Sequence, residues 1–502
     1  MMSIAPEPTV EPGALMMVDI PGVRLDAATT AFLREAKIRA VCLFRRNFGS
    51  EAEVALLTRE LREVLGPRAL IALDQEGGSV VRSTFLPQAP SAMALGAADD
   101  ERLARDVGAG VARSLRSLGI NWNFAPVLDV NNNPANPVIA ERSFGETPNV
   151  VTRLAGAWMD GSLHEGVACC AKHFPGHGDT TIDSHVALPT VARSRAELDA
   201  LELAPFHALR HAAPAMMTAH ILYPTLDHEH PATLSRAIVG GILRDEWGYD
   251  GVVITDALMM KAISERYGYA RAAVMAIAAG ADMVLAQGSI EDQRITLDAL
   301  RNAFADGVLP EARGVEARIR LDHLATRFPA TCVEYTAQQR AADTALMQRA
   351  WAAGLTVVRG ARPPARNAPL RVIVQAEVPT DHVAEAGVDG VAVLAQFEGF
   401  TDVQPLLLDD LSTLDWNALP RDGRSNILVS TRRERYGAAA RMWRPDLHLV
   451  LWNPFQALDV RAPALLTWGY ADGALAALRA WLNGQASAPG LPLPSLLEAN
   501  TP

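Results

Sequence analysis

The sequence predicts an α/β protein, with a (β/α)8 barrel of the TIM type followed by a smaller α/β sandwich domain with a mostly parallel sheet. Three observations support this prediction. Eight short apolar runs alternate with helix-like patterns between residues 14 and 308. The runs are almost continuously apolar, as strands buried on both faces should be. Polar residues stand where many of these runs end, which is typical of the face of such a barrel that binds ligands.

The eight runs are expected to form the barrel strands in chain order. They cover residues 14–20, 39–44, 69–73, 120–128, 167–173, 215–219, 251–255 and 283–286. Helix signals separate them. Ser50 with Glu53, and Ser194 with Glu197, have the spacing of capping boxes. The alternation predicts strand–helix units that repeat around a closed barrel.

Charged side chains and histidines gather at the predicted carboxyl ends of the strands. In a (β/α)8 barrel these ends carry the chemistry, whereas the opposite face stabilises the fold. The residues at these positions are Asp19, Arg46, Asp74, Asp129, Lys172, His173, His220 and Asp256. His220 could line the pocket or be a core histidine with its hydrogen bonds satisfied.

The chain is expected to divide into three parts. Residues 1–330 form the catalytic barrel domain, residues 331–354 a linker helix, and residues 355–502 a second domain. New apolar runs in the second domain are interpreted as strands of its sheet. They cover residues 370–374, 390–394, 426–429, 447–451 and 464–468.

Composition narrows the class of protein. The net charge is −11 for 502 residues, and no basic stripe is present, which argues against a nucleic-acid partner. No run is long enough to cross a membrane, and the N-terminus lacks the features of a signal peptide. The four cysteines lack metal or disulfide spacing and are expected to be free thiols. We therefore expect a cytoplasmic protein with neither a membrane nor a nucleic-acid partner. The sequence predicts no oligomeric state.

The stretch 167–189 is the densest in titratable groups. A buried strand ends in Lys172 and His173, and a loop rich in Gly, Pro and Thr follows. The loop contains His177, Asp183 and His185. A strand that ends in two hydrogen-bond donors and is followed by such a loop is typical of an active site on an α/β scaffold.

Five motifs together resemble those of family 3 glycoside hydrolases of the β-N-acetylglucosaminidase type. They lie in this order in most of residues 10–310: Asp74-Gln75-Glu76-Gly77-Gly78 with Arg82, Phe124–Asp129, Glu141-Arg142-Ser143-Phe144-Gly145, Lys172–Gly178 with Asp183-Ser184-His185, and Thr255-Asp256-Ala257-Leu258. The C-terminal domain resembles the sandwich that many members append.

The resemblance implies that Asp256 is the nucleophile of a retaining glycosidase, which needs a carboxylate beneath the anomeric carbon. The alternative is an Asp that caps the following helix. The resemblance also implies that His185, oriented by Asp183, is the acid/base, because an imidazole titrates near neutrality. Otherwise the pair would only bond the loop backbone. β-Glucosidase relatives take a Glu from the C-terminal domain instead, so this domain is expected to be non-catalytic.

A set of five residues is expected to bind the hydroxyl groups of the terminal sugar, because Asp accepts and Lys, Arg and His donate. The set is Asp74, Arg82, Arg142, Lys172 and His173. Lys172 could alternatively form a Schiff base, and Arg82 could belong to a surface ion pair.

No cofactor or metal is expected. Most histidines lie between residues 164 and 230. His173 and His177 are four residues apart, but Pro175 and Gly176 break any helix between them, so this is not the helical spacing of a two-histidine zinc site.

The predicted function is a retaining exo-β-N-acetylhexosaminidase with a small carbohydrate substrate. By resemblance, it would release terminal β-linked N-acetylglucosamine from peptidoglycan fragments during cell-wall recycling, or from chitin oligosaccharides. The alternatives are a β-N-acetylglucosaminide phosphorylase, a β-glucosidase or β-xylosidase, and a non-catalytic sugar-binding protein.

Overall fold

The computed structural model describes residues 10–379, 383–384 and 387–498, which lie in two compact units. The first unit comprises the chain up to residue 75, residues 108–129 and residues 159–336. The second comprises residues 76–107, residues 130–158 and the chain from residue 337. Two segments that precede residue 330 therefore belong to the second unit. The predicted division into domains at residues 330 and 354 stays a prediction. The two compact units group segments by their contacts, which is a different division of the chain.

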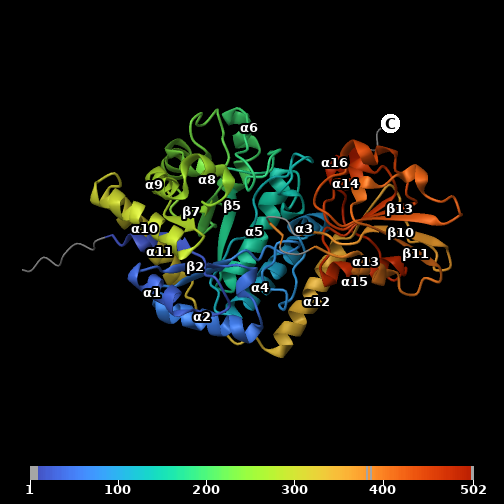
Figure 1. Cartoon of the computed structure of the whole chain (residues 1–502), viewed down its shortest axis with the longest axis horizontal. Coiled ribbons are helices and arrows are strands. Elements are labelled where there is room, and N and C mark those ends of the chain that lie inside the picture. The colour runs from blue at the N-terminus through green and yellow to red at the C-terminus, as the bar shows by residue number, and fades with distance from the viewer. Residues whose placement is uncertain (1–9, 380–382, 385–386, 499–502) are drawn as a thin grey trace, which may run out of the picture. The chain divides into compact units, whose positions relative to one another are not determined.

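The first unit contains a closed barrel of eight parallel strands in chain order, which confirms the predicted barrel (Figure 1). Each strand lies within or overlaps one of the eight predicted runs. The strands are β1 Met16–Val18, β2 Ala40–Leu43, β3 Leu70–Leu73, β4 Trp122–Asn123, β5 Ala168–Phe174, β6 Ala215–Thr218, β7 Val252–Ala257 and β8 Met283–Ala286.

Helices connect the strands, as the alternating pattern predicts. They are α1 Ala27–Glu35, α2 Glu51–Leu65, α4 Glu101–Ser117, α5 Pro148–His164, α6 Arg195–Ala200, α7 Ala204–Leu209, the π-type helix η5 Arg236–Glu246, α8 Lys261–Tyr267, α9 Tyr269–Ala279, α10 Ile290–Ala305 and α11 Glu311–Arg327. Both predicted capping boxes form: Ser50 and Glu53 begin α2, and Ser194 and Glu197 begin α6. The strands are buried along almost their whole length, which explains their continuous apolar runs.

The second unit contains a six-stranded sheet in the order β11-β10-β12-β13-β14-β9. All neighbouring strands are parallel except β14 and β9, so the predicted mostly parallel sheet is confirmed. The elements of this unit are β9 Thr356–Val358, β10 Leu370–Gln375, β11 Val403–Leu408, β12 Ser425–Ser430, β13 Leu447–Val450, β14 Ala464–Leu466, α3 Ala92–Ala98, α12 Ala337–Gly354, α13 Gly390–Leu394, α14 Gln456–Asp459, α15 Asp472–Leu482 and α16 Pro494–Glu498.

Helices cover both faces of this sheet (Figure 1). Val372 and Val374 of β10 pack in one apolar cluster with α13 and α15, whereas Ile373 between them packs in another. The alternation follows the two-residue period of a strand. The sheet is therefore a buried middle layer, as in other open parallel sheets.

The prediction of a strand at 390–394 is wrong, because Gly390–Leu394 forms helix α13. The side chain of Asp389 caps this helix by accepting a hydrogen bond from the amide of Ala392. The run was too short to distinguish a strand from a helix by its apolar content. Strand β11 was missed instead; it lies at the edge of the sheet and contains Pro405, which an edge strand tolerates.

Helix α12 packs against α3 within the second unit. The indole of Trp351 donates to the carbonyl of Gln88 at 3.1 Å. A side chain at Gly354 would come within 2.7 Å of the carbonyl oxygen of Ala94, so glycine permits a close approach here. These contacts explain why residues 76–107 belong to the second unit.

All four cysteines are free, as predicted, with Cys332 exposed and the other three buried. No helix in the described ranges is long and apolar enough to span a membrane.

The carboxylate of Asp282, just before β8, is fully buried among three arginines. Arg244 and Arg313 donate to it, Arg320 lies 3.3 Å away, and the amide of Val253 donates at 2.9 Å. The carboxylate therefore neutralises cations that would otherwise repel one another.

We expect Asp282→Asn to lower the free energy of unfolding of the barrel by about 3–5 kcal/mol, because the arginines lose their counter-charge. Urea unfolding at neutral pH measures this change. As a control, Asp298→Asn on the exposed surface of α10 should change it by no more than about 0.5 kcal/mol. Equal effects of the two substitutions would contradict the role of the buried cluster.

Glu202 lies in the connection between β5 and β6, and its carboxyl group is buried. A side chain at Gly176 would come within 2.7 Å of the Cβ of Glu202, so the two segments are in close contact. Arg193 lies 3.3 Å from Glu202 and also donates to Asp179 at 2.6 Å. Burial outweighs the charge of Arg193 and raises the pKa of Glu202 from 4.5 to about 7.

The raised pKa means that the folded chain holds this proton more tightly than the unfolded chain does. The contribution of Glu202 to stability is therefore present below about pH 4.5 and is lost as the pH rises through about 7. Between about pH 5 and about pH 8, the wild type should lose up to about 3 kcal/mol relative to Glu202→Gln. Thermal unfolding at several pH values tests this. Glu265→Gln, exposed on α8, should follow the wild type; a Glu202→Gln profile parallel to wild type would refute the assignment.

Candidate active site

Strand β5 ends in two of the predicted sugar-binding residues. The ammonium group of Lys172 donates to the carboxylate of Asp74, at the end of β3, at 2.6 Å. The side chain of Lys172 is only 2% exposed, whereas Asp74 is 18% exposed. The register of β5 with β6 shifts between Ala171 and Phe174, and the peptide bonds before His173 and Pro175 are both cis.

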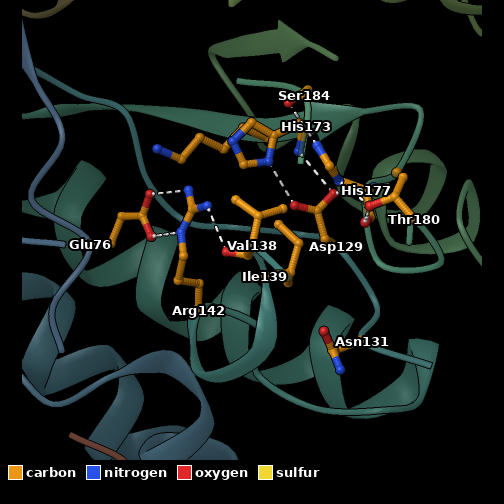
Figure 2. Close-up of polar contacts among 12 residues, drawn as sticks. Glu76, Asp129, Asn131, Val138, Ile139, Arg142, His173, His177, Thr180 and Ser184 are labelled. Carbon is orange, nitrogen blue, oxygen red and sulfur yellow. Dashed lines mark hydrogen bonds and ion pairs between the residues drawn. The ribbon is translucent and has the colours of Figure 1, made fainter. Parts of the chain in front are cut away.

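The buried carboxylate of Asp129, beyond β4, binds the turn that follows β5 (Figure 2). It accepts from the amide of His173 at 3.1 Å, from the ring Nδ1 of His173 at 2.7 Å, and from the amide of His177 at 2.7 Å. Burial opposes the charged form, but the nearby histidines and these hydrogen bonds outweigh it and lower the pKa of Asp129. An ionised acceptor therefore holds the start of the loop.

Further hydrogen bonds continue along the loop. The ring of His177 contacts the hydroxyl groups of Thr180 at 2.8 Å and Ser184 at 3.0 Å (Figure 2). The amide of Ala262 in α8 donates to the carbonyl of Ser184 at 3.4 Å. The loop is thus attached at its root by Asp129 and near its far end by α8.

Asp183 and His185 form the predicted pair on this loop. Oδ1 of Asp183 lies 2.8 Å from Nδ1 of His185 and accepts from the amide of His185 at 2.9 Å. Burial opposes ionisation of Asp183, but its bonds to His185 outweigh this effect and lower the pKa of Asp183 to about 2. An ionised Asp183 accepts a hydrogen bond from Nδ1–H, so Nε2 is the atom that can exchange a proton with a ligand.

Asp256 is the next-to-last residue of β7 and the only partly buried residue of this otherwise buried strand. Its Oδ1 accepts from the amide of Ala257 at 2.7 Å. Next to it, the buried ring of His220 contacts the carbonyl of Ala257 through Nε2 at 3.0 Å and the hydroxyl of Thr233 through Nδ1 at 2.8 Å. Burial lowers the pKa of His220, and its two hydrogen bonds make it a buried core residue that fixes the backbone beside Asp256.

Three histidines set the electrostatic environment of Asp256. Burial acts to raise its pKa, but His220, His173 and His185 outweigh burial and lower it. The carboxylate is therefore ionised at neutral pH. The loop that carries His185 is joined to α8, the helix after β7, because the amide of Ala262 donates to the carbonyl of Ser184 at 3.4 Å.

Two predicted residues, Arg142 and Arg82, belong to the second unit. Arg142 donates to Glu76 from Nε at 2.9 Å and from Nη2 at 2.8 Å, a bidentate pair (Figure 2). The buried guanidinium of Arg82 donates to the carbonyl of Val383 at 3.4 Å. Arg82 is 7% exposed and is therefore not a surface residue.

The neighbour of Arg142, Glu141, is fully buried in the same unit. Its Oε1 accepts from Ser79 at 2.6 Å and from the indole of Trp452 at 2.8 Å, and it lies 3.3 Å from Arg433. Residues of the C-terminal sheet region therefore support the motif that carries Arg142.

The first unit thus brings six predicted residues to the carboxyl ends of its strands and the adjoining loop. They are Asp74, Lys172, His173, Asp183, His185 and Asp256. The predicted sugar-binding and catalytic sets omit Asp129, which partners His173, and Glu76, which partners Arg142. Their positions in the motifs were visible, but their partners lie 44 and 66 residues away along the chain. Of the described residues, no three of His, Cys, Asp and Glu are grouped as metal ligands would be.

Comparison with known proteins supports the resemblance found in the sequence. Residues 10–324 match the model of the glycosyl hydrolase family 3 N terminal domain. A β-hexosaminidase of Alkalilimnicola ehrlichii is 39% identical over 279 residues, which are 54% of this chain and 79% of that protein.

Two known structures extend the comparison. The family 3 β-N-acetylglucosaminidase of Paenibacillus sp. FPU-7 has a TM-score of 0.87 and 34% identity, over 96% of this chain and 98% of that one. NagZ of Neisseria gonorrhoeae, in complex with N-trifluoroacetyl-D-glucosamine, has a TM-score of 0.57 and 32% identity, over 67% and 98%. The predicted family is confirmed: the chain belongs to glycoside hydrolase family 3.

Proposed function

We propose that this enzyme is a retaining exo-β-N-acetylhexosaminidase that works through a covalent glycosyl-enzyme intermediate. One observation carries the proposal: the carboxylate of Asp256 lies near the end of a barrel strand, and the loop that bonds to the following helix carries His185, an imidazole that Asp183 orients. A nucleophile and an acid/base are the two groups that a retaining glycosidase requires. The similarity to a β-hexosaminidase and to a β-N-acetylglucosaminidase supports the acetamido substrate.

In the first step, the Asp256 carboxylate attacks the anomeric carbon and the bond to the leaving group breaks. Protonated His185 gives its Nε2 proton to the departing glycosidic oxygen. The carboxylate of Asp183 stabilises the imidazolium before transfer and keeps Nδ1 as the donor to itself. The products are an ester between the sugar and Asp256 and a free alcohol.

In the second step, neutral His185 accepts a proton from water through Nε2. The oxygen of this water attacks the anomeric carbon, and the ester bond to Asp256 breaks. The sugar leaves with the anomeric configuration of the substrate, because two inversions have occurred. Asp256 returns as a carboxylate and His185 as an imidazolium.

The sugar-binding set is proposed to hold the terminal ring while this occurs. Asp74 can accept from hydroxyl groups while Lys172, His173, Arg82 and Arg142 donate. The contact of Lys172 with Asp74 supports a role as a hydrogen-bond donor, since an ammonium held by a carboxylate is not a nucleophile for a Schiff base. We further propose the natural substrate: the enzyme removes terminal N-acetylglucosamine from peptidoglycan fragments in the cytoplasm, or from chitin oligosaccharides.

The nucleophile is tested by trapping. A 2-deoxy-2-fluoro glycosyl fluoride should form a stable ester on the peptide that contains Asp256, because the 2-fluorine slows both steps while the fluoride leaving group keeps the first step fast enough for the ester to accumulate. Asp256→Asn should lose at least about 1,000-fold in kcat, since an amide cannot act as the nucleophile. Peptide mass spectrometry reads out the labelled residue. A label on another carboxylate, or wild-type activity in Asp256→Asn, would overturn the mechanism.

The acid/base is tested by the leaving group. His185→Ala should lose about 100- to 10,000-fold on a substrate with a sugar leaving group, which needs protonation. The loss should be much smaller on a dinitrophenyl glycoside, whose leaving group needs none. His228→Ala, with an exposed imidazole elsewhere in the first unit, serves as the control. Equal losses of His185→Ala on both substrates would remove His185 from proton transfer.

The same assays separate the alternative functions. Preference for the 2-acetamido sugar over glucose and xylose glycosides is expected of a hexosaminidase. Release of a sugar 1-phosphate in phosphate buffer would instead identify a phosphorylase. Binding without turnover of any glycoside would identify a sugar-binding protein.

A further inference from the structure

The second unit has a cavity of about 720 Å³ at the carboxyl edge of its sheet. The residues that line it come from just beyond three neighbouring strands and from Trp452 beyond β13. They are Gln375, Ala376, Glu377, Val378, Pro379, Asp409, Asp410, Arg432, Arg433, Glu434 and Trp452. None of the residues proposed for catalysis or sugar binding is among them.

The topology of the sheet places this cavity where open parallel sheets bind ligands. From β10 the chain passes to β11 on one side, and from β12 it passes to β13 on the other. The order therefore reverses between β10 and β12, and the crevice beyond such a point is the usual ligand site of a doubly wound sheet. Gln375 ends β10, and Arg432 and Arg433 follow β12, on the two sides of this point.

A buried acceptor points to a missing partner. The side chain of Gln375 is 5% exposed, and its Nε2 donates to the carbonyl of Glu377 at 2.8 Å. Its Oε1 is buried and, among the residues that the structure describes, has no hydrogen-bond donor. A buried amide oxygen without a donor is costly, so a ligand that donates here would be stabilised.

The charges of the lining favour a cation. Glu377 and Asp409 are exposed, and no hydrogen bond or ion pair of either side chain is found in the described part of the chain. The guanidinium of Arg432, by contrast, donates to Asp410 at 2.7 Å and to Glu434 at 3.1 Å. Two carboxylates are thus available to a ligand, while this arginine is already paired.

The other arginine is also engaged. Arg433 donates to the carbonyl of Val138 and to the hydroxyl of Ser79, both at 3.2 Å, and lies over the ring of Trp452 at 5.0 Å. The side chain of Arg433 is therefore a fixed part of the cavity lining, and little of its positive charge is available to a ligand. The cavity therefore offers mainly hydrogen-bond acceptors and negative charge.

We propose that this cavity is a second binding site, for a small molecule that carries a protonated amine and hydroxyl groups. Glu377 and Asp409 bind the ammonium group, and the amide oxygen of Gln375 accepts from a hydroxyl. An unacetylated amino sugar is the simplest molecule with both features. The site lies apart from the proposed nucleophile in sequence and in unit, so the inference does not depend on the proposed function.

Calorimetric titration of the full chain with D-glucosamine tests this site, with D-glucose as the neutral analogue. Wild type should bind D-glucosamine with a Kd of about 1 mM or below, more tightly than D-glucose by about tenfold. The double variant Glu377→Gln with Asp409→Asn should weaken D-glucosamine binding at least about tenfold and leave D-glucose unchanged, because it removes charge but little volume.

Two controls locate the binding. Glu398→Gln, an equally conservative change at a side chain 81% exposed outside the cavity, should bind like wild type. Asp256→Asn should also bind D-glucosamine like wild type, which separates this site from the proposed active site. Absence of D-glucosamine binding by wild type, equal affinity for D-glucose, or wild-type affinity in the double variant would each overturn the proposal.

Discussion

The buried carboxylate of Asp129 is the constraint on which the arrangement of the active-site loop depends. It lies beyond one barrel strand and binds the backbone and a ring of the segment that leaves the next strand. A buried charge that loses a partner costs several kcal/mol, so the turn after β5 has one strongly favoured path. That path determines the positions of the Lys172 and His173 side chains. It also determines where the loop that carries Asp183 and His185 begins.

The two proposed catalytic groups are held in different ways, and the difference suits their tasks. Asp256 sits on a barrel strand, beside a buried His220 whose ring contacts the adjacent backbone carbonyl. A nucleophile benefits from such rigid support. His185 sits on a loop attached by hydrogen bonds through His177 and Ser184. A loop can adjust its approach to the leaving group while Asp183 keeps the ring in one tautomer.

The barrel could be predicted because its strands are buried on both faces and therefore read as eight apolar runs with polar ends. In the second unit, apolar content did not predict the structure of the short run at 390–394. This run forms a helix whose first turn is capped by the side chain of Asp389. Apolar content also failed to predict β11, whose residues are largely exposed at the sheet edge. The motifs contain Arg142, His173, Glu76 and Asp129, but they did not predict that Arg142 pairs with Glu76 or that His173 pairs with Asp129, because pairing across many residues leaves no local pattern.

The central claim is that the carboxylate of Asp256 and the imidazole of His185 act on one sugar ring from either side of its glycosidic bond. The most direct measurement is a crystal structure of the Asp256→Asn enzyme with an intact β-linked N-acetylglucosamine disaccharide. We expect Nε2 of His185 within about 3 Å of the glycosidic oxygen and the substituted side chain at position 256 beneath the anomeric carbon. A carboxylic acid in place of His185 at that oxygen, or an anomeric carbon far from residue 256, would contradict this account.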